Sequence, residues 1–188
     1  SELTTRVTEG TTTIYVTVEV SSSILLLPEV PMTGRLDNPR VGYFTNPLTN
    51  FSDGQQRVNK KQFITRWRLE PKPEDREAYL RGELVEPHKP IVFYIENSTP
   101  YRWRKYIKQG IEDWQVAFER AGFKNAIIAK DITDDMEVDM DDVNYSVLTY
   151  AASTKANAMG PSILDPRSGE ILEADIMWWH NVLSMLQE

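Results

Sequence analysis

The side chains of this sequence that are best suited to chemistry are two histidines and the carboxylates near the C-terminus. A zinc-binding helix of the HExxH type needs histidines at positions i and i+4, because both imidazoles must then leave the same helix face. His180 is followed at i+4 by Ser184, and His88 lies far away in the sequence. A lone histidine beside a tryptophan pair more often packs or caps than binds a metal. The two histidines therefore predict no HExxH zinc site, and we assign no catalytic residue and no zinc ligand within these 188 residues.

Glu173 and Asp175 are the second candidate for chemistry. If residues 170–178 form a strand, these two side chains share one face with Cα atoms about 6.6 Å apart, and Glu170 lies on the other face. Such a pair could act as acid and base in glycoside hydrolysis, whose carboxyl groups lie roughly 5 to 9.5 Å apart. Acidic side chains also protect sheet edges against aggregation, and we favour that interpretation here.

The segment 131–142, DITDDMEVDMDD, is dense in carboxylates. Calcium is bound by carboxylates from a short loop, so the segment is a candidate calcium site. The EF-hand pattern fails, because no glycine supplies the sharp turn at its sixth position. A solvated acidic loop is the alternative, and the sequence leaves the two open.

The composition argues against several functional classes. The net charge is −7 and the pI is about 5.0, whereas binding to nucleic acid or to an anionic membrane requires clustered Lys and Arg. No apolar run approaches the roughly 18 residues of a transmembrane helix. The absence of cysteine excludes disulfides and thiolate metal sites. No glycine-rich phosphate loop and no nucleophile elbow is present.

The element that organises the chain is a predicted helix over residues 98–122. Its apolar residues recur with a period near 3.6, at Trp103, Ile107, Ile111, Trp114, Phe118 and Ala121. Short apolar runs at 91–95 and 126–129 flank it, as expected for strands buried on both faces. Strand, helix and strand together predict a right-handed βαβ crossover with parallel strands.

Further strands are expected within residues 11–27, 63–69, 145–152 and 170–178, with a short one at 41–45. Of the two strands expected within 11–27, the second, at Ile24 to Leu27, should be buried. The proline-rich segment 71–90 predicts a domain boundary with one helical turn near residues 74–80. We therefore expect an α+β fold, a mixed twisted sheet backed by one long helix, with a β-rich domain at 1–86 and an α/β-like domain at 87–188.

Several long phrases resemble a bacterial family of large zinc-dependent metalloproteases with a metzincin-type catalytic domain. They are RVGYF at 40–44, ITRWRLE at 64–70, the stretch from KPIVFYIENSTPYRWRKY to AIIAKD at 89–131, and NAMGPSILDPRSGEILEADIMWWHNVL at 157–183. The resemblance covers most of the chain from about residue 24 onward. It implies that residues 1–86 end a preceding β-rich domain and that residues 87–188 begin the catalytic domain.

The resemblance also implies a site. In metzincins one antiparallel edge strand borders the cleft, and the substrate pairs with it as an added strand. The residues matched to that position are Glu170, Ile171, Leu172, Glu173, Ala174, Asp175 and Ile176. Zinc and its HExxH helix are expected beyond Glu188, so this chain alone should be inactive and free of zinc, with a peptide or protein as the substrate of the parent enzyme.

Two more expectations follow from the resemblance. The parent protein is expected to be exported, to the periplasm, the outer membrane or the medium. Residues 178–187 are expected to be helical and to lead toward the zinc helix. Because the zinc helix is expected beyond Glu188, the cleft face of this chain should be uncovered, with Trp178 and Trp179 exposed, and a dimer could bury them.

A function of another class fits the same elements. A complete α/β domain without catalysis could present an edge strand to a peptide or a protein partner. The sequence elements alone do not separate this binding module from a fragment of a peptidase.

Overall fold

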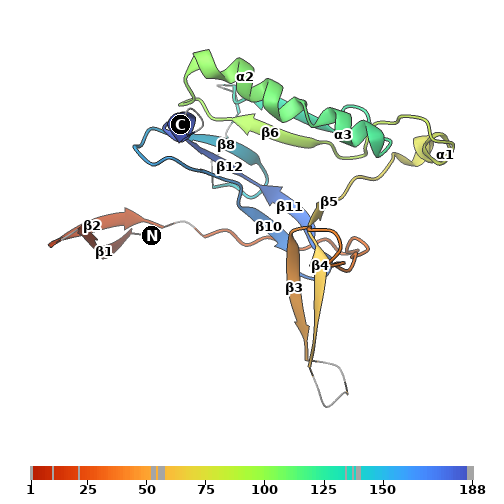
Figure 1. Cartoon of the computed structure of the whole chain (residues 1–188), viewed down its shortest axis with the longest axis horizontal. Coiled ribbons are helices and arrows are strands. Elements are labelled where there is room, and N and C mark those ends of the chain that lie inside the picture. The colour runs from red at the N-terminus through yellow and green to blue at the C-terminus, as the bar shows by residue number, and fades with distance from the viewer. Residues whose placement is uncertain are drawn as a thin grey trace.

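The computed structural model describes residues 2–9, 11–20, 22–51, 54, 58–133, 135–136, 138 and 141–185. It has an α+β fold, which confirms the predicted class (Figure 1). The elements are β1 (Glu2–Glu9), β2 (Thr12–Glu19), β3 (Thr45–Asn50), β4 (Asn59–Ile64), β5 (Arg66–Trp67), a 3-10 turn (Pro73–Asp75), α1 (Arg76–Leu80), β6 (Ile91–Ile95), α2 (Tyr101–Glu112), α3 (Gln115–Arg120), β7 (Ile127–Asp131), β8 (Ser146–Ala151), β9 (Ala158–Met159), β10 (Ser162–Asp165), β11 (Glu170–Ala174), β12 (Ile176–Trp179) and α4 (Val182–Met185).

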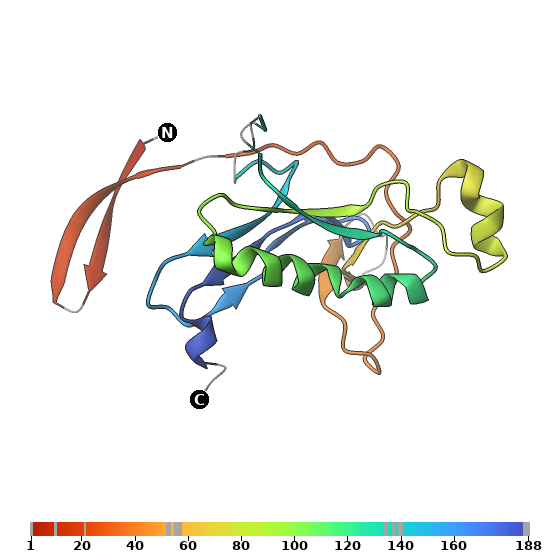
Figure 2. The ribbon, with the colours of Figure 1, turned by 90° about the horizontal axis from the view of Figure 1, so that it is seen from above.

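A five-stranded sheet in the order β7-β6-β8-β12-β9 forms the centre of the molecule. Its first four strands are parallel to one another, and β9 is antiparallel to β12. Helices α2 and α3 cover one face of this sheet (Figure 2). The core between them contains Ile91, Phe93, Ile111, Ala129 and Leu148, with Ile107, Phe118 and Ile176 packed against it. The predicted βαβ crossover is therefore confirmed.

The long helix is interrupted, which the sequence pattern did not predict. α2 ends at Glu112 and α3 begins at Gln115, and Trp114 between them is 65% exposed although its position in the pattern placed it on the buried face. Just after the interruption, the side chain of Gln115 binds the loop that follows α3: its Nε2 donates to the Phe123 carbonyl at 3.0 Å and its Oε1 accepts from Ala126 N at 2.9 Å. Gly122 ends α3 at φ +95°, as its place in the sequence predicts.

A second sheet of three strands, in the order β10-β11-β5, continues from the first. β11 is antiparallel to β10 and parallel to β5, where Glu170 and Ile171 pair with Arg66 and Trp67. Only Asp175 separates β11 from β12. The N-terminal region therefore contributes a strand to the C-terminal region, and the boundary at residue 86 stays a prediction.

The N-terminal residues form two hairpins. β1 and β2 pair antiparallel and extend away from the rest of the molecule, whereas β3 and β4 pair near β5 (Figure 1). The prediction of a buried strand at Ile24 to Leu27 is wrong: the segment is irregular, with Ile24 99% exposed and Leu26 92% exposed. The single strand expected at 63–69 is split between β4, which pairs with β3, and β5, which pairs with β11.

The expectation that residues 178–187 form a helix with Trp178 and Trp179 exposed also needs correction. Trp178 and Trp179 belong to β12, and helix α4 begins only at Val182. Trp179 is buried beneath the ammonium group of Lys155, and the half-buried Trp178 packs on Tyr150. The exposed tryptophan face that motivated a dimer is therefore absent from the described residues.

Candidate peptide-binding edge

The two edges of the five-stranded sheet differ in how their backbone groups are satisfied. At β7, side chains from the covering helices bind outward-facing amides: Glu112 Oε1 accepts from Ala129 N at 3.2 Å and Gln115 Oε1 accepts from Ile127 N at 3.4 Å. A sheet edge covered in this way does not readily accept another strand.

The opposite edge is β9, and β10 of the three-stranded sheet follows it in the chain. Trp179 N donates to the Asn157 carbonyl at 3.2 Å, and Asp175 N donates to the Pro161 carbonyl at 3.0 Å. Because backbone groups alternate in direction along a strand, Ala158, Gly160 and Ser162 direct their N–H and C=O groups outward. Within the described part of the chain, no other element bonds to these groups; Ala158 N reaches the side chain of the adjacent Asn157. We call residues 157–163 the open edge.

The composition of the open edge leaves it unprotected. Residues 158–163 are all exposed, and none of residues 157–163 is charged. Pro161 is the one feature that usually discourages strand addition, but its nitrogen lies on the side of β12. An extended peptide can therefore pair with the open edge as an additional strand.

The predicted edge residues, 170–176, are not at an edge. Glu170 and Ile171 pair with β10 on one side and with β5 on the other. Further along, Ala174 N donates to Ser146 Oγ at 3.2 Å, and Asp175 Oδ1 accepts from Val147 N at 2.8 Å, so β8 lies beside this end. The prediction of an edge here is wrong because the chain folds back as a hairpin at 165–169 and places β10 on the outside.

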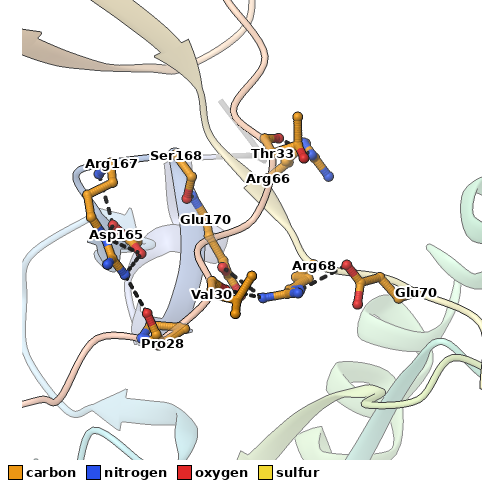
Figure 3. Close-up of polar contacts among 10 residues, drawn as sticks. All are labelled: Pro28, Val30, Thr33, Arg66, Arg68, Glu70, Asp165, Arg167, Ser168 and Glu170. Atoms are coloured by element: carbon orange, nitrogen blue, oxygen red, sulfur yellow. Dashed lines mark hydrogen bonds and ion pairs between the residues drawn. The ribbon is translucent and has the colours of Figure 1, made fainter.

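The turn at 165–169 holds β10 against β11. Asp165 is fully buried, and the guanidinium of Arg167 donates to both of its carboxylate oxygens, with Nη2 at 2.7 Å from Oδ2 (Figure 3). These hydrogen bonds hold the pKa of Asp165 below its usual value. Gly169 adopts φ +75°, and a Cβ atom there would lie 2.5 Å from the Ile64 carbonyl oxygen, so this position requires glycine.

Three arginines bind backbone carbonyls of the extended segment 28–33. Arg167 donates to Pro28 O at 2.7 Å, Arg68 to Val30 O at 3.0 Å and Arg66 to Thr33 O at 2.7 Å (Figure 3). Arg68 also pairs with Glu70 at 3.0 Å. The segment therefore links the turn behind the open edge to β5.

A cavity of about 360 Å³ lies beside the open edge, and we call it the acidic cavity. It is lined by Ser23, Asp141, Asp142, Val143, Ile163, Glu173 and Asp175. Glu173 is only 6% exposed, and its Oε1 has no hydrogen-bond partner among the described residues. Burial, together with the neighbouring Asp175 carboxyl, raises the pKa of Glu173 to about 8. The structure thus brings together the pair that the sequence spacing predicted.

The other candidates from the sequence are the two histidines and the acidic segment 131–142, of which Asp141 and Asp142 line the acidic cavity. His180 Nδ1 is 2.7 Å from Tyr150 Oη, and His88 is exposed. Of the acidic segment, Asp131 forms ion pairs with Lys108 and Arg104, whereas Asp134, Glu137 and Asp139 lie outside the described residues, so the calcium hypothesis is untested. In the described part of the chain, no three His, Cys, Asp or Glu side chains are placed to hold a metal ion.

Sequence reasoning missed the open edge itself. Gly160 and Pro161 are residue types that favour turns, and the strands they separate are only two and four residues long. The available signal was the absence of charge over these residues, which is unusual in an exposed segment.

Comparison with known proteins adds one match. The family described as a domain of unknown function (DUF5117) matches residues 1–72, a region that ends just after β5. Neither a curated protein nor a solved structure matches the chain. Among the described residues, α2 is the longest helix at 12 residues, and no helix has the length and apolar character needed to cross a membrane.

Proposed function

We propose that this chain is part of an exported zinc-dependent metallopeptidase and that the open edge holds the substrate backbone. The observation that carries the proposal is an unprotected antiparallel edge, β9 with β10, on a mixed sheet backed by α2 and α3. The resemblance to metzincin-type proteases implies such an edge beside the cleft. The edge lies within residues 157–183, one of the phrases that carry the resemblance.

In this proposal the chain binds the peptide substrate and orients its backbone. Outward N–H and C=O groups at Ala158, Gly160 and Ser162 would pair with a peptide in extended conformation, independently of its side chains. The ion pair between the buried Asp165 and the partly exposed Arg167 would hold the edge in place before the substrate arrives.

The described residues do not form a zinc site, so no chemical step is assigned to them. Zinc held elsewhere in the parent enzyme would polarise the scissile carbonyl and lower the pKa of its bound water. In this proposal, residues of this chain position the peptide, and residues elsewhere in the parent enzyme bind the zinc ion.

A binding module without catalysis is the second candidate. It is favoured by the fact that the open edge and its anchoring turn are complete within the described residues and need no metal to accept a strand. In that case the partner is a protein or peptide that is bound and not cleaved.

One experiment separates the two candidates. The protein of the complete reading frame and the 188-residue chain are each assayed for zinc content and for cleavage of a quenched fluorescent peptide, with and without a chelator. The peptidase proposal expects stoichiometric zinc and chelator-sensitive cleavage in the longer protein only. Peptide binding without zinc or cleavage in both proteins identifies a binding module, and zinc with cleavage in the 188-residue chain contradicts the assignment of the zinc site to residues outside this chain.

A further inference from the structure

The acidic cavity lies where a side chain of a bound strand would point. Ile163 of β10 and Glu173 of β11 are partners in the antiparallel register, so their side chains lie on one face of the sheet, and both line the cavity. A strand added outside β10 places one residue opposite Ile163, with its side chain on that same face. The cavity is therefore adjacent to one defined position of the peptide.

The charges of the cavity are all of one sign. Four carboxylates, Asp141, Asp142, Glu173 and Asp175, line it, and its lining within the described residues includes no Lys, Arg or His. Glu173 is more than nine-tenths buried, with its Oε1 facing no hydrogen-bond donor in the described part of the protein. Glu173 shares a hydrogen bond with the Asp175 carboxyl, but its Oε1 is left without a donor, and a buried oxygen without a donor is costly. The site therefore favours a ligand that brings N–H donors and a positive charge, which would also stabilise the ionised form of Glu173.

We propose that the acidic cavity binds a Lys or Arg side chain of the peptide that pairs with the open edge, so that the protein selects peptides with a basic residue opposite Ile163. This inference rests on the proposed role of the open edge. Pairing with the open edge uses backbone groups and does not select among side chains. The acidic cavity would add a selection for peptides that carry a basic residue.

The dimensions agree with a long basic side chain. The backbone of the added strand would lie two strand spacings, about 9.6 Å, from the backbone of Glu173. Lys has a flexible four-carbon stem, and Arg presents a rigid fork of five donors, so either side chain can extend over Ile163 toward the carboxylates.

A metal ion fits the cavity less well. A calcium ion needs several oxygens converging at 2.3 to 2.6 Å, and no three carboxylates of the described residues are arranged for that. An ammonium or guanidinium group has several donors that can bind oxygens further apart. The arrangement of the carboxylates therefore favours a basic side chain over an ion.

Fluorescence anisotropy with defined peptides tests the inference. The probes are labelled acetyl-Thr-Val-Thr-Lys-Thr-Val-Thr-amide, its Arg version and a twin with norleucine in place of Lys, each titrated with the 188-residue chain at neutral pH. We expect the Lys and Arg peptides to bind about tenfold more tightly than the norleucine twin, the effect of charge-assisted hydrogen bonds. Glu173→Gln and Asp175→Asn should each reduce the ratio of Lys-peptide to norleucine-peptide affinity toward one.

The control is Glu83→Gln, the same chemical change at an exposed side chain that pairs with Arg81 away from the cavity, and it should keep the preference. Equal binding of the Lys and norleucine peptides overturns the inference and leaves the open edge as proposed. Binding of neither peptide overturns the role of the open edge as well. Saturable calcium binding that is lost in Glu173→Gln, without a preference for Lys, also overturns the inference and identifies a metal site.

Discussion

Arg167 lies in the turn at 165–169 between β10 and β11 and connects this turn to the distant segment 28–33. Its guanidinium donates to the buried Asp165 carboxylate and, through Nη2, to the Pro28 carbonyl. A buried carboxylate left without its partner destabilises a protein much more than the intact pair stabilises it. The Arg167 side chain is 41% exposed, so water reaches one end of the pair and moderates this cost.

Arg167→Ala is therefore expected to lower the free energy of unfolding by about 2 kcal/mol, below the range for fully buried pairs. Arg167→Lys keeps the charge but loses the bidentate geometry, and it should cost about 1 kcal/mol. Urea denaturation followed by circular dichroism measures both. A loss smaller for Ala than for Lys would show that the ion pair does not hold the turn.

The carboxyl of Glu173 predicts a pH dependence of stability. Its pKa is raised to about 8, because burial and the Asp175 carboxyl disfavour its charged form. The folded state therefore binds more protons than the unfolded state between the ordinary value of 4.5 and about 8. By proton linkage, stability is greatest below this interval and falls as the pH rises through it, by at most about 1.4 kcal/mol per pH unit for one group.

Glu173→Gln removes this titration. The difference in unfolding free energy between the variant and the natural chain should rise from about pH 4.5 to about pH 8 in favour of the variant and then level off. Chemical denaturation at a series of pH values tests this, with Glu83→Gln as the control. A difference that does not change with pH would mean that Glu173 titrates as an exposed carboxyl.

At the scale of the element, β9 and β10 are short strands whose importance comes from their position. They lie outside β12 and β11, and they bring the backbone of Ala158, Gly160 and Ser162 to the open edge. The edge at β7 has no such role, because Glu112 and Gln115 occupy its amides. Within the part of the chain that the structure describes, only the β9 side of the central sheet is therefore available for strand addition.

Ser162→Pro removes an outward N–H group from the open edge while leaving the inward hydrogen bonds of β10 in place. We expect peptide affinity to fall about tenfold, the cost of one lost backbone hydrogen bond plus the steric effect of the ring. Ser162→Ala keeps the N–H group and should bind as the natural chain does. Both variants are measured by fluorescence anisotropy with the norleucine peptide, and equal affinity in the two variants would exclude pairing at Ser162.

At the scale of the whole molecule, the N-terminal and C-terminal regions share a core. β5 pairs with β11, and Trp67 packs edge-to-face on Phe93 of β6 with ring centroids 6.3 Å apart. The arginine contacts to segment 28–33 add further connections between the same regions. The region matched by DUF5117 therefore includes a residue that supports the central sheet.

Trp67→Ala should consequently destabilise the C-terminal sheet, by about 3 kcal/mol for a large aromatic side chain at a core. Trp114→Ala is the matched control, since Trp114 is 65% exposed, and its change should stay within about 1 kcal/mol. Urea denaturation of both variants, monitored by circular dichroism, measures the difference. Equal effects of the two substitutions would show that Trp67 is not part of the shared core.

Much of the fold could be predicted from the sequence, because it depends on local patterns. The apolar runs at 91–95 and 126–129 and the helical period between them determine a βαβ unit, and the spacing of Glu173 and Asp175 places them together. Glycine at 122 and 169 marks the ends of a helix and of a turn, since both positions have positive φ.

Only the tertiary structure decided which strand lies at the open edge. The two strands of a hairpin have similar sequence patterns, so residues 157–179 do not predict which strand faces solvent. The outcome depends on β8 and β5, which pair on the inner side. The burial of Trp179 likewise involves a distant residue, Lys155, whose ammonium group lies over its ring. Sequence periodicity determines which residues share a face, whereas pairing between distant segments determines which face and which edge remain free.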